Sequence, residues 1–321
     1  MNSLTSSLEM NDIYCENGAQ NNFVNELKVV TMPGCLLFNE PMSAHTTFKI
    51  GGPADYLVMP SSFKEVSEVV SICRKYKVPV TILGNGSNVL VLDKGIRGVV
   101  LKFTDKLAYI KYENEVLYAG TGAMLKDVSK HSLRESLIGL EFAIGIPGSV
   151  GGAVFMNAGA YDGEMSQVVS AVTAITEDNK IKRFSKEDLH FGYRHSRFQE
   201  SFSIILEVEF SLRHGDRHEI ITRMDDYTEK RESRQPVDSA SAGSVFKRPE
   251  GNYAGTLIEE SGLKGFRVGG AQVSLKHAGF IVNADDATAQ DVLDLIEKIK
   301  QTVYEKFQVE LMSEVRVIGE R

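Results

Sequence analysis

The segment EFAIGIPGSVGGAVFMNAGA, Glu141–Ala160, is the part of the sequence best suited to hold a ligand against bare backbone. Its five glycines are separated almost only by small or apolar residues. Glycine lets a ligand or another chain segment approach closely, at a cost in folding entropy that an ordinary strand or helix would not bear. Because the run is apolar, unlike a polar linker, we expect it to be buried and ordered. Its N–H groups favour a flat or anionic partner.

A second glycine turn, GNGSN at Gly84–Asn88, joins a VTILG strand to a VLVL strand. A Rossmann fingerprint or a P-loop must open a helix, because the helix N-terminus holds the phosphates, so neither motif is present. Successive N–H groups in such a turn can still form a nest for a phosphate. Taken alone, the turn favours a tight hairpin, and both interpretations stay open at this point.

The composition is that of an ordinary globular protein. The chain has 321 residues, 42% of them hydrophobic and 25% charged, which is enough for two domains. A formal net charge of −7 argues against nucleic-acid binding, which usually leaves a basic footprint. No apolar run reaches the ~20 residues that span a bilayer, and we expect no signal peptide. Cys15, Cys35 and Cys73 lack metal-ligand spacing, so we expect reduced thiols in a cytoplasmic protein and no metal.

The periodicity of hydrophobic residues predicts the helices and strands that must position these turns. Residues 1 to about 30 are polar and aperiodic, and we expect a loosely ordered extension there. Ser62 and Glu65 form a capping box that opens a helix ended by Pro79. A charged helix at residues 219–231 marks the boundary to a second domain. Further strands are predicted at residues 98–103, 107–112, 115–120, 168–176, 181–184, 204–212 and 309–319, and further helices at 124–136, 257–260 and 289–307.

Seven segments together resemble one family, and they occur in order between Leu36 and Gly319. They are TTFKIGGPADY, ILGNGSNVLV, GIPGSVGGAVFMNAGAY, FGYRHS, AGSVFKRP, KHAGFIVNA and EVRVIG. They resemble the UDP-N-acetylenolpyruvoylglucosamine reductases, flavin enzymes that make UDP-N-acetylmuramate for bacterial peptidoglycan. No insertion that would add a lid follows the FAD-binding region that the resemblance implies, so the chain is similar to the shorter, second type of this family.

The resemblance implies an α+β fold. Residues 36–213 would form an FAD-binding region of the vanillyl-alcohol-oxidase or p-cresol-methylhydroxylase type, with α+β subdomains at about 36–103 and 104–213. Residues 214–321 would form an α+β substrate domain, and residues 1–35 an N-terminal extension. The implied reaction is the NADPH-dependent reduction of an enolpyruvyl ether through non-covalently bound FAD.

The resemblance also assigns roles to residues. Arg194 would grip the pyruvyl carboxylate, Ser244 would donate a proton to the enolate carbon, and Glu314 would polarise the enolate. Without the family, the residues favour a surface arginine and a turn serine, and the plain interpretation of Glu314 is a carboxylate in an ion pair on a solvated strand face. Cofactor contacts are implied for Gly84, Asn85, Gly86, Ser87, Asn88, Gly122, Pro147, Gly148, Ser149, Gly151, Gly152, Ala153 and Asn157, and substrate contacts for Tyr193, Lys247, Arg248, Asn252 and His277.

Two other functions remain open. An FAD-dependent oxidase of a small alcohol or sugar would use the same fold, and a nucleotide-sugar binding protein would have lost turnover. EVRVIG and AGSVFKRP speak against the oxidase, and a binding protein has no use for a proton donor. We expect a cytoplasmic monomer whose partners are UDP-N-acetylglucosamine enolpyruvate and NADPH, with no nucleic acid and no membrane.

Overall fold

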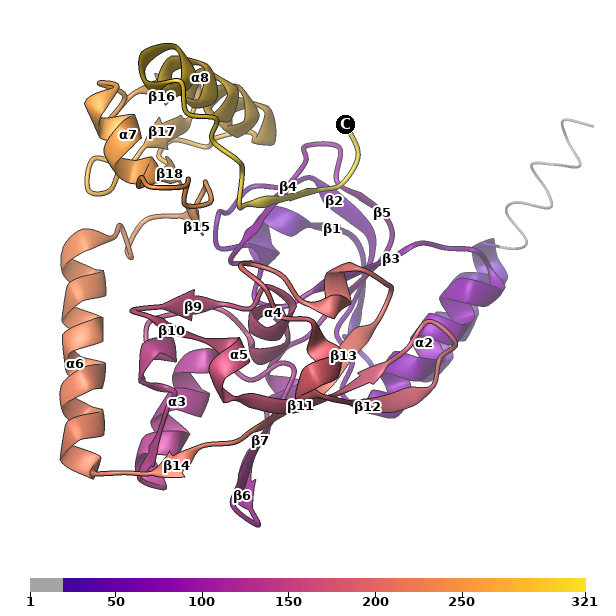
Figure 1. The fold of residues 1–321 in the computed structure, drawn as a ribbon. Helices are drawn as coiled ribbons and strands as arrows, with labels where there is room; N and C mark the ends of the chain where they lie inside the picture. Colours follow the sequence, from indigo (N-terminus) through magenta and orange to yellow (C-terminus); the bar gives the residue numbers. More distant parts are fainter. Residues whose placement is uncertain (1–19) are drawn as a thin grey trace, which may run out of the picture.

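The computed structural model describes residues 20–321, and its three larger sheets follow one another along the chain (Figure 1). The first sheet has the strand order β1-β2-β5-β3, with β1 antiparallel to β2 and the remaining pairs parallel. Helix α2 covers it, and buried valines at 3.6-residue spacing on α2 make the contact. The elements are β1 (Leu36–Pro41), β2 (Pro53–Val58), α2 (Phe63–Lys75), β3 (Val80–Leu83) and β5 (Ile96–Lys102).

The second sheet is antiparallel throughout, with the order β12-β11-β13-β7-β6. The strands predicted at residues 168–176 and 181–184 are confirmed as β11 and β12, which pair antiparallel around a turn in which Asn179 has φ +59°. Short helices that interrupt the chain between β7 and β11 pack on this sheet. The elements are β6 (Ile110–Glu113), β7 (Val116–Gly120), α3 (Leu125–Arg134), α4 (Val150–Phe155), α5 (Met165–Val168), β11 (Val169–Ile175), β12 (Ile181–Ser185) and β13 (Ile204–Phe210).

The third sheet, β15-β18-β17-β16, lies beyond the long helix α6 and is covered by α7 and α8 (Figure 1). It is tied to the first part of the chain, because Phe48 and Leu90 belong to the same buried cluster as Val245 and Ile258. The elements are α6 (Arg217–Arg234), β15 (Ser241–Ser244), α7 (Ala254–Glu260), β16 (Arg267–Val268), β17 (Ala271–Val273), β18 (Phe280–Asn283) and α8 (Ala289–Phe307). Smaller pairs are β8 (Leu137–Ile138) with β14 (Arg213–His214), β9 (Gly159–Ala160) with β10 (Gly163–Glu164), and β4 (Val89–Val91) with β19 (Arg316–Ile318).

The C-terminal segment is not one long strand, so the prediction for residues 309–319 is wrong in extent. Ser313 forms a single bridge to Phe246, and only Arg316–Ile318 form a strand, β19, parallel to β4. The segment changes partners as it passes from the third sheet to the first part of the chain, so no face continues along it. Leu311 and Val315 are buried as alternation predicts, but Val317 is 42% exposed.

Two local predictions at the start of the chain are also wrong. Residues 20–30 are helical, and Phe23 and Leu27 are buried against α2, so this part is not a loose extension. Residues 1–19 lie outside the described part. At α2, the Ser62 hydroxyl accepts from the Glu65 N–H, but the Glu65 carboxylate accepts from the N–H of Ser61 instead of returning to Ser62. In residues 20–321 no helix is long and apolar enough to cross a membrane.

Candidate active site

One large cavity, of about 1020 Å³, brings together segments that lie far apart in the sequence. Its wall includes the GNGSN turn, residues 146–149 and 151–153, the turn at residues 193–194, the end of β15 and the C-terminal segment. The volume lies at the upper end of the ~300–1,000 Å³ usual for ligand sites. All four residues of β3 line this cavity, and all but Leu83 are only partly buried.

The two glycine segments meet at one end of the cavity. The Asn85 amide donates to the Pro147 carbonyl at 2.7 Å, and a Cβ at Gly84 would lie 2.3 Å from the Ser149 hydroxyl oxygen. The GNGSN turn is not a hairpin, because β3 pairs with β5 and β4 pairs with β19. Within the described chain, the N–H groups of residues 85–88 donate to no protein acceptor. Such a run of free donors fits a phosphate nest.

The GNGSN turn and residues 146–153 together form a cradle beside the cavity. The space around Gly148 shows whether the glycines of this cradle are explained by protein packing or leave room for a ligand. A Cβ at Gly151 would lie 2.1 Å from the Thr121 hydroxyl oxygen, so internal packing alone explains that glycine. A Cβ at Gly148 would have no protein atom closer than 3.8 Å, although Gly148 lines the cavity. A side chain at position 148 would therefore occupy the space beside the free N–H groups. The cradle fits the diphosphate and flat ring of a flavin dinucleotide.

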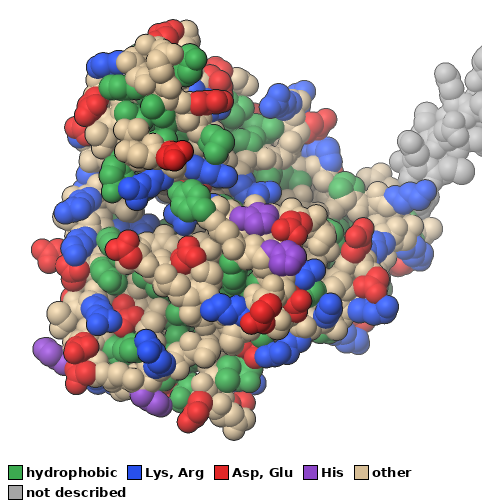
Figure 2. Space-filling view, viewed as in Figure 1, with side chains coloured by type: hydrophobic (Ala, Val, Ile, Leu, Met, Phe, Trp, Pro, Cys, Tyr) green, Lys and Arg blue, Asp and Glu red, His purple; other side chains and the backbone are tan. Residues whose placement is uncertain are grey.

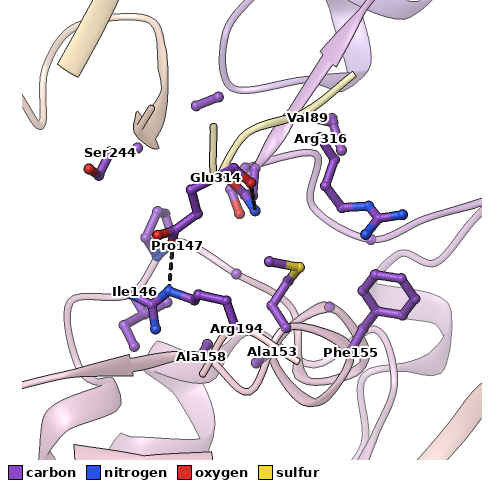
Figure 3. A pocket seen from close by; sticks show the side chains of 18 of the residues that line it. Val89, Ile146, Pro147, Ala153, Phe155, Ala158, Arg194, Ser244, Glu314 and Arg316 are labelled. Atoms are coloured by element: carbon purple, nitrogen blue, oxygen red, sulfur yellow. Dashed lines mark hydrogen bonds and ion pairs between the residues drawn. The ribbon is translucent and has the colours of Figure 1, made fainter. Parts of the chain in front are cut away.

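An ion pair between Arg194 and Glu314 lines the cavity (Figure 3). The Arg194 Nε lies 2.6 Å from the Glu314 Oε1, and both side chains are largely shielded from solvent. Burial raises the pKa of Glu314, while the positive charges of Arg194 and Lys247 act in the opposite direction. The carboxyl therefore holds its proton to higher pH than an exposed glutamate does.

Ser244 reaches the same cavity from the end of β15. In Figure 3, Ser244 and Arg316 lie on opposite sides of Glu314. The Ser244 hydroxyl donates to the Phe246 carbonyl at 3.2 Å, a long bond that a better acceptor in the cavity could replace. The three residues expected to be catalytic thus line the same cavity and come from three separate segments.

The residues expected to bind substrate divide into two groups. Tyr193, Arg248 and His277 line the cavity. The Tyr193 hydroxyl accepts from the Arg248 N–H at 3.2 Å, and burial lowers the pKa of His277, which favours a neutral imidazole. Lys247 and Asn252 are not on the wall, although the charge of Lys247 is felt at Glu314.

Two of the expected cofactor residues also lie behind the wall. A Cβ at Gly122 would lie 2.0 Å from the Thr104 carbonyl oxygen, so packing explains this glycine. Asn157 is buried and connects two turns, because its amide donates to the Gly192 carbonyl and accepts from the Ser166 N–H. The other expected cofactor residues line the cavity: Gly84, Asn85, Gly86, Ser87, Asn88, Pro147, Gly148, Ser149, Gly151, Gly152 and Ala153.

The structure adds Arg231 of α6, which the sequence analysis missed. Its side chain lines the cavity beside Gly145, where a Cβ would lie 2.6 Å from the Arg231 Cδ. Burial lowers the pKa of Arg231, and its guanidinium forms no hydrogen bond or ion pair with any residue of 20–321. The only signal in the sequence was the helical spacing of Tyr227, Arg231 and Gln235, which is common on any exposed helix.

The cavity is cationic although the whole chain is acidic. Its charged lining comprises five cationic side chains and two carboxylates, an excess of three positive charges. On the face seen in Figure 2, several Lys and Arg side chains lie where the third sheet and its helices meet the rest of the molecule. A focused positive potential of this kind favours polyanionic ligands. The described residues contain no group of three or more His, Cys, Asp or Glu arranged for a metal ion.

Comparison with known proteins finds two family models that match separate parts of the chain. Residues 54–185 match the model of an FAD binding domain, and residues 235–318 match that of the C-terminal domain of UDP-N-acetylenolpyruvoylglucosamine reductase. The reductase of Clostridium perfringens strain SM101 is 53% identical over 281 residues, covering 88% of this chain and 92% of the relative. That of Clostridium botulinum strain Langeland is 50% identical over 299 residues, covering 93% and 97%.

A solved structure extends the likeness to three dimensions. The crystal structure of the reductase from Thermus caldophilus has a TM-score of 0.75 and 36% identity, and the match covers 88% of this chain and 97% of that one. The fold class of this chain is therefore α+β, with an FAD-binding region followed by a smaller C-terminal domain. The chain belongs to the UDP-N-acetylenolpyruvoylglucosamine reductase family.

Proposed function

We propose that this protein reduces the enolpyruvyl ether of UDP-N-acetylglucosamine to UDP-N-acetylmuramate, with NADPH as the reductant and FAD as the bound cofactor, in peptidoglycan synthesis. The observation that carries the proposal is the cationic cavity, lined by Arg194 and Glu314, in a chain about half identical to reductases of that name. The direct test is NADPH-dependent conversion of the enolpyruvyl substrate to UDP-N-acetylmuramate, followed by mass spectrometry. Absence of that product from cofactor-loaded protein would contradict the proposal.

The cradle is where we place the cofactor. FAD, when bound, supplies a two-electron relay between NADPH and the substrate. The N–H groups of residues 85–88 would hold its diphosphate, and the bare backbone at Gly148 would leave room for its ring. We divide the chain into an FAD-binding region at 36–213, with subdomains at about 36–103 and 104–213, and a substrate region at 214–321. The matched family models support this division.

Arg194 is the residue we assign to the substrate carboxylate. A planar guanidinium can hold both oxygens of a carboxylate, and its attraction grows as negative charge develops on the enolate. In this structure its Nε bonds to Glu314, which leaves its terminal nitrogens for a ligand. The backbone of Arg194 is left-handed, with φ +55°, a conformation that non-glycine residues adopt mainly where the fold imposes it.

Glu314 and Ser244 complete the proposed chemistry. A protonated Glu314 can donate a hydrogen bond to the pyruvyl carboxylate, and burial favours that protonated form. The Ser244 hydroxyl would then deliver its proton to the α-carbon as the enolate collapses. The positive charge of Lys247, next to this strand, would stabilise the alkoxide that remains. An oxidase of alcohols would need neither a carboxylate clamp nor a proton donor.

We also propose a monomer that works in the cytoplasm, where NADPH and UDP-activated sugars are supplied. The comparisons leave the oligomeric state open. A mass near twice 35.5 kDa in light scattering would contradict the monomer.

Replacing Gly148 with valine is expected to empty the cofactor site without unfolding the protein. The added side chain meets no protein atom closer than 3.8 Å from its Cβ but enters the cavity. We expect the FAD dissociation constant to rise at least about tenfold, equal to ~1.4 kcal/mol, and the unfolding free energy of the apoprotein to change by less than ~1 kcal/mol. Fluorescence titration with FAD and urea unfolding measure the two, and Gly148→Ala should give an intermediate effect. Unchanged FAD affinity would contradict the placement.

Replacing Arg231 with glutamine is expected to weaken binding of UDP to the oxidised holoprotein by ~10- to 100-fold, the value of a charge-assisted hydrogen bond. Its guanidinium has no protein partner in the described residues, so it remains available to an anionic ligand. Perturbation of the flavin absorbance measures the affinity. Arg234→Gln is the matched control, because Arg234 is exposed on the same helix and does not line the cavity. Equal weakening of UDP binding by both variants would contradict a specific contact with Arg231, because it would show that the loss of any nearby positive charge has the same effect.

A further inference from the structure

Gln199 lies behind the cavity wall, where its side chain connects three segments. The Gln199 Nε2 donates to the Phe155 carbonyl at 2.7 Å and to the Arg194 carbonyl at 3.0 Å. The Gln199 Oε1 accepts from Nη1 of Arg316 at 3.2 Å. The amide therefore uses both its donors and its acceptor on backbone and side chains of other segments, and Gln199 itself does not line the cavity.

Each of these contacts involves a segment of the proposed site: the cofactor-lining helix α4, the turn of Arg194, or the strand that follows Glu314. The first, the bond to the Phe155 carbonyl, holds the end of α4. The guanidinium of Arg316 also lies there, 4.9 Å from the centre of the Phe155 ring. The second holds the turn of Arg194. The third holds the strand β19 two residues after Glu314, and Figure 3 shows Arg316 and Phe155 together on one side of the Arg194–Glu314 pair.

The turn of Arg194 needs such support. A non-glycine residue at φ +55° is strained and persists only where its surroundings over-determine it. The His195 N–H, which shares a planar peptide unit with the Arg194 carbonyl, donates to the Gly192 carbonyl at 3.0 Å and so holds one edge of that plane. The Gln199 amide donates to the Arg194 carbonyl itself and holds the other edge of the same plane.

We propose that Gln199 is a positioning residue for the reaction, one that sets the Arg194 turn against the strand of Glu314. The inference rests on the proposed function, because it assumes that this pair acts on the substrate. Gln199 does not line the cavity, and it forms no hydrogen bond with the side chain of Arg194 or Glu314. It acts through the Arg194 carbonyl on one side and through Arg316 on the other.

The Arg194–Glu314 pair offers a measurable quantity, the pH dependence of the substrate step, that a purely structural role of Gln199 would not change. The charged groups that act on Glu314 are Arg194 on the turn and Lys247 after β15. Arg316, two residues further along the chain, points away from Glu314 toward the Phe155 ring (Figure 3). Arg194 lowers the pKa of Glu314 against the effect of burial. When the turn loosens, this lowering weakens, so the pKa of Glu314 rises. The pH at which the rate of the substrate step changes with the protonation of Glu314 is then expected to move upward.

The experiment compares Gln199→Leu with Gln167→Leu in the FAD-loaded protein. Gln167 is the matched control, because its amide also donates to a backbone carbonyl, that of Asp162 at 3.1 Å, but away from the cavity. Stopped-flow absorbance separates bleaching by NADPH from recolouring by the UDP-sugar. For Gln199→Leu we expect recolouring to slow by ~10- to 100-fold through misplacement of the pair, bleaching to stay within about twofold, and the pH profile of recolouring to shift upward. The control should match wild type.

A second variant guards against simple misfolding. Gln199→Glu keeps the size of the side chain and a partner for Arg316, but loses the N–H donors to the two carbonyls. We expect it to slow recolouring and shift the pH profile in the same direction. Variants that lower only the melting temperature, with recolouring and its pH profile as in wild type, would overturn the inference. A wild-type protein that NADPH does not bleach would instead overturn the proposed function.

Discussion

Replacing Ser244 with alanine is expected to leave bleaching of the flavin by NADPH unchanged and to slow recolouring by the UDP-sugar by ~10²- to 10⁴-fold, the usual contribution of a general acid. The hydroxyl lies on the cavity wall and is held only by a 3.2 Å bond to the Phe246 carbonyl. Because the first step requires no proton from this residue, only the second depends on it. Anaerobic stopped-flow absorbance measures both steps in one protein.

Ser241→Ala is the control for this experiment. Ser241 lies on the same strand, β15, but does not line the cavity, so both steps should keep wild-type rates. Equal slowing of bleaching and recolouring by Ser244→Ala would contradict the proton-donor role. It would mean that the side chain shapes the cavity for both ligands.

Replacing Arg194 with lysine is expected to slow the substrate step by ~10²- to 10³-fold, as removal of one group that stabilises a developing charge usually does. Lysine keeps the positive charge but presents no planar pair of donors to a carboxylate. It also cannot keep the 2.6 Å bond from Nε to Glu314 with the same geometry. Reduction by NADPH should be affected much less, since no carboxylate is then held.

Arg197→Lys is the matched change in the same loop. Arg197 donates to the Asp188 carbonyl and lies over the Phe184 ring, away from the cavity. The variant should be near wild type in both steps. Full activity of Arg194→Lys would contradict the clamp and leave a simple requirement for positive charge.

Elements that depend on local signals were predictable from the sequence. Helix α8 begins after Thr288, whose hydroxyl accepts from the Asp291 N–H while the Asp291 carboxylate accepts from the Thr288 N–H. Its buried residues recur at helical spacing, and the observed bounds Ala289–Phe307 equal the predicted ones. Such elements carry their start, period and end within a short window.

Elements that depend on tertiary partners were not predictable. The helix at residues 20–30 is polar, and only Phe23 and Leu27 bury fully, so its order comes from packing on α2. The C-terminal segment alternates in sequence, but it changes pairing partner near Glu314 and therefore loses its strand for several residues.

The candidate site shows the same limit. Arg194 and Glu314 are 120 residues apart, and no period or spacing brings them together. They were identified in advance only through the family resemblance, whereas the glycine cradle was suggested by composition alone. Arg231 and Gln199 could not be singled out from the sequence, because an arginine on a charged helix and a glutamine after a loop are ordinary surface residues until the fold places them.

The central claim is that one cavity holds a flavin that NADPH reduces and that the enolpyruvyl sugar reoxidises. Sequential mixing without oxygen tests it most directly, with the purified protein mixed first with NADPH and then with UDP-N-acetylenolpyruvoylglucosamine. We predict a yellow protein that bleaches in the first mix and recolours in the second, with one UDP-N-acetylmuramate formed per flavin. A protein without flavin absorbance, or one that recolours only when oxygen is admitted, would contradict the account.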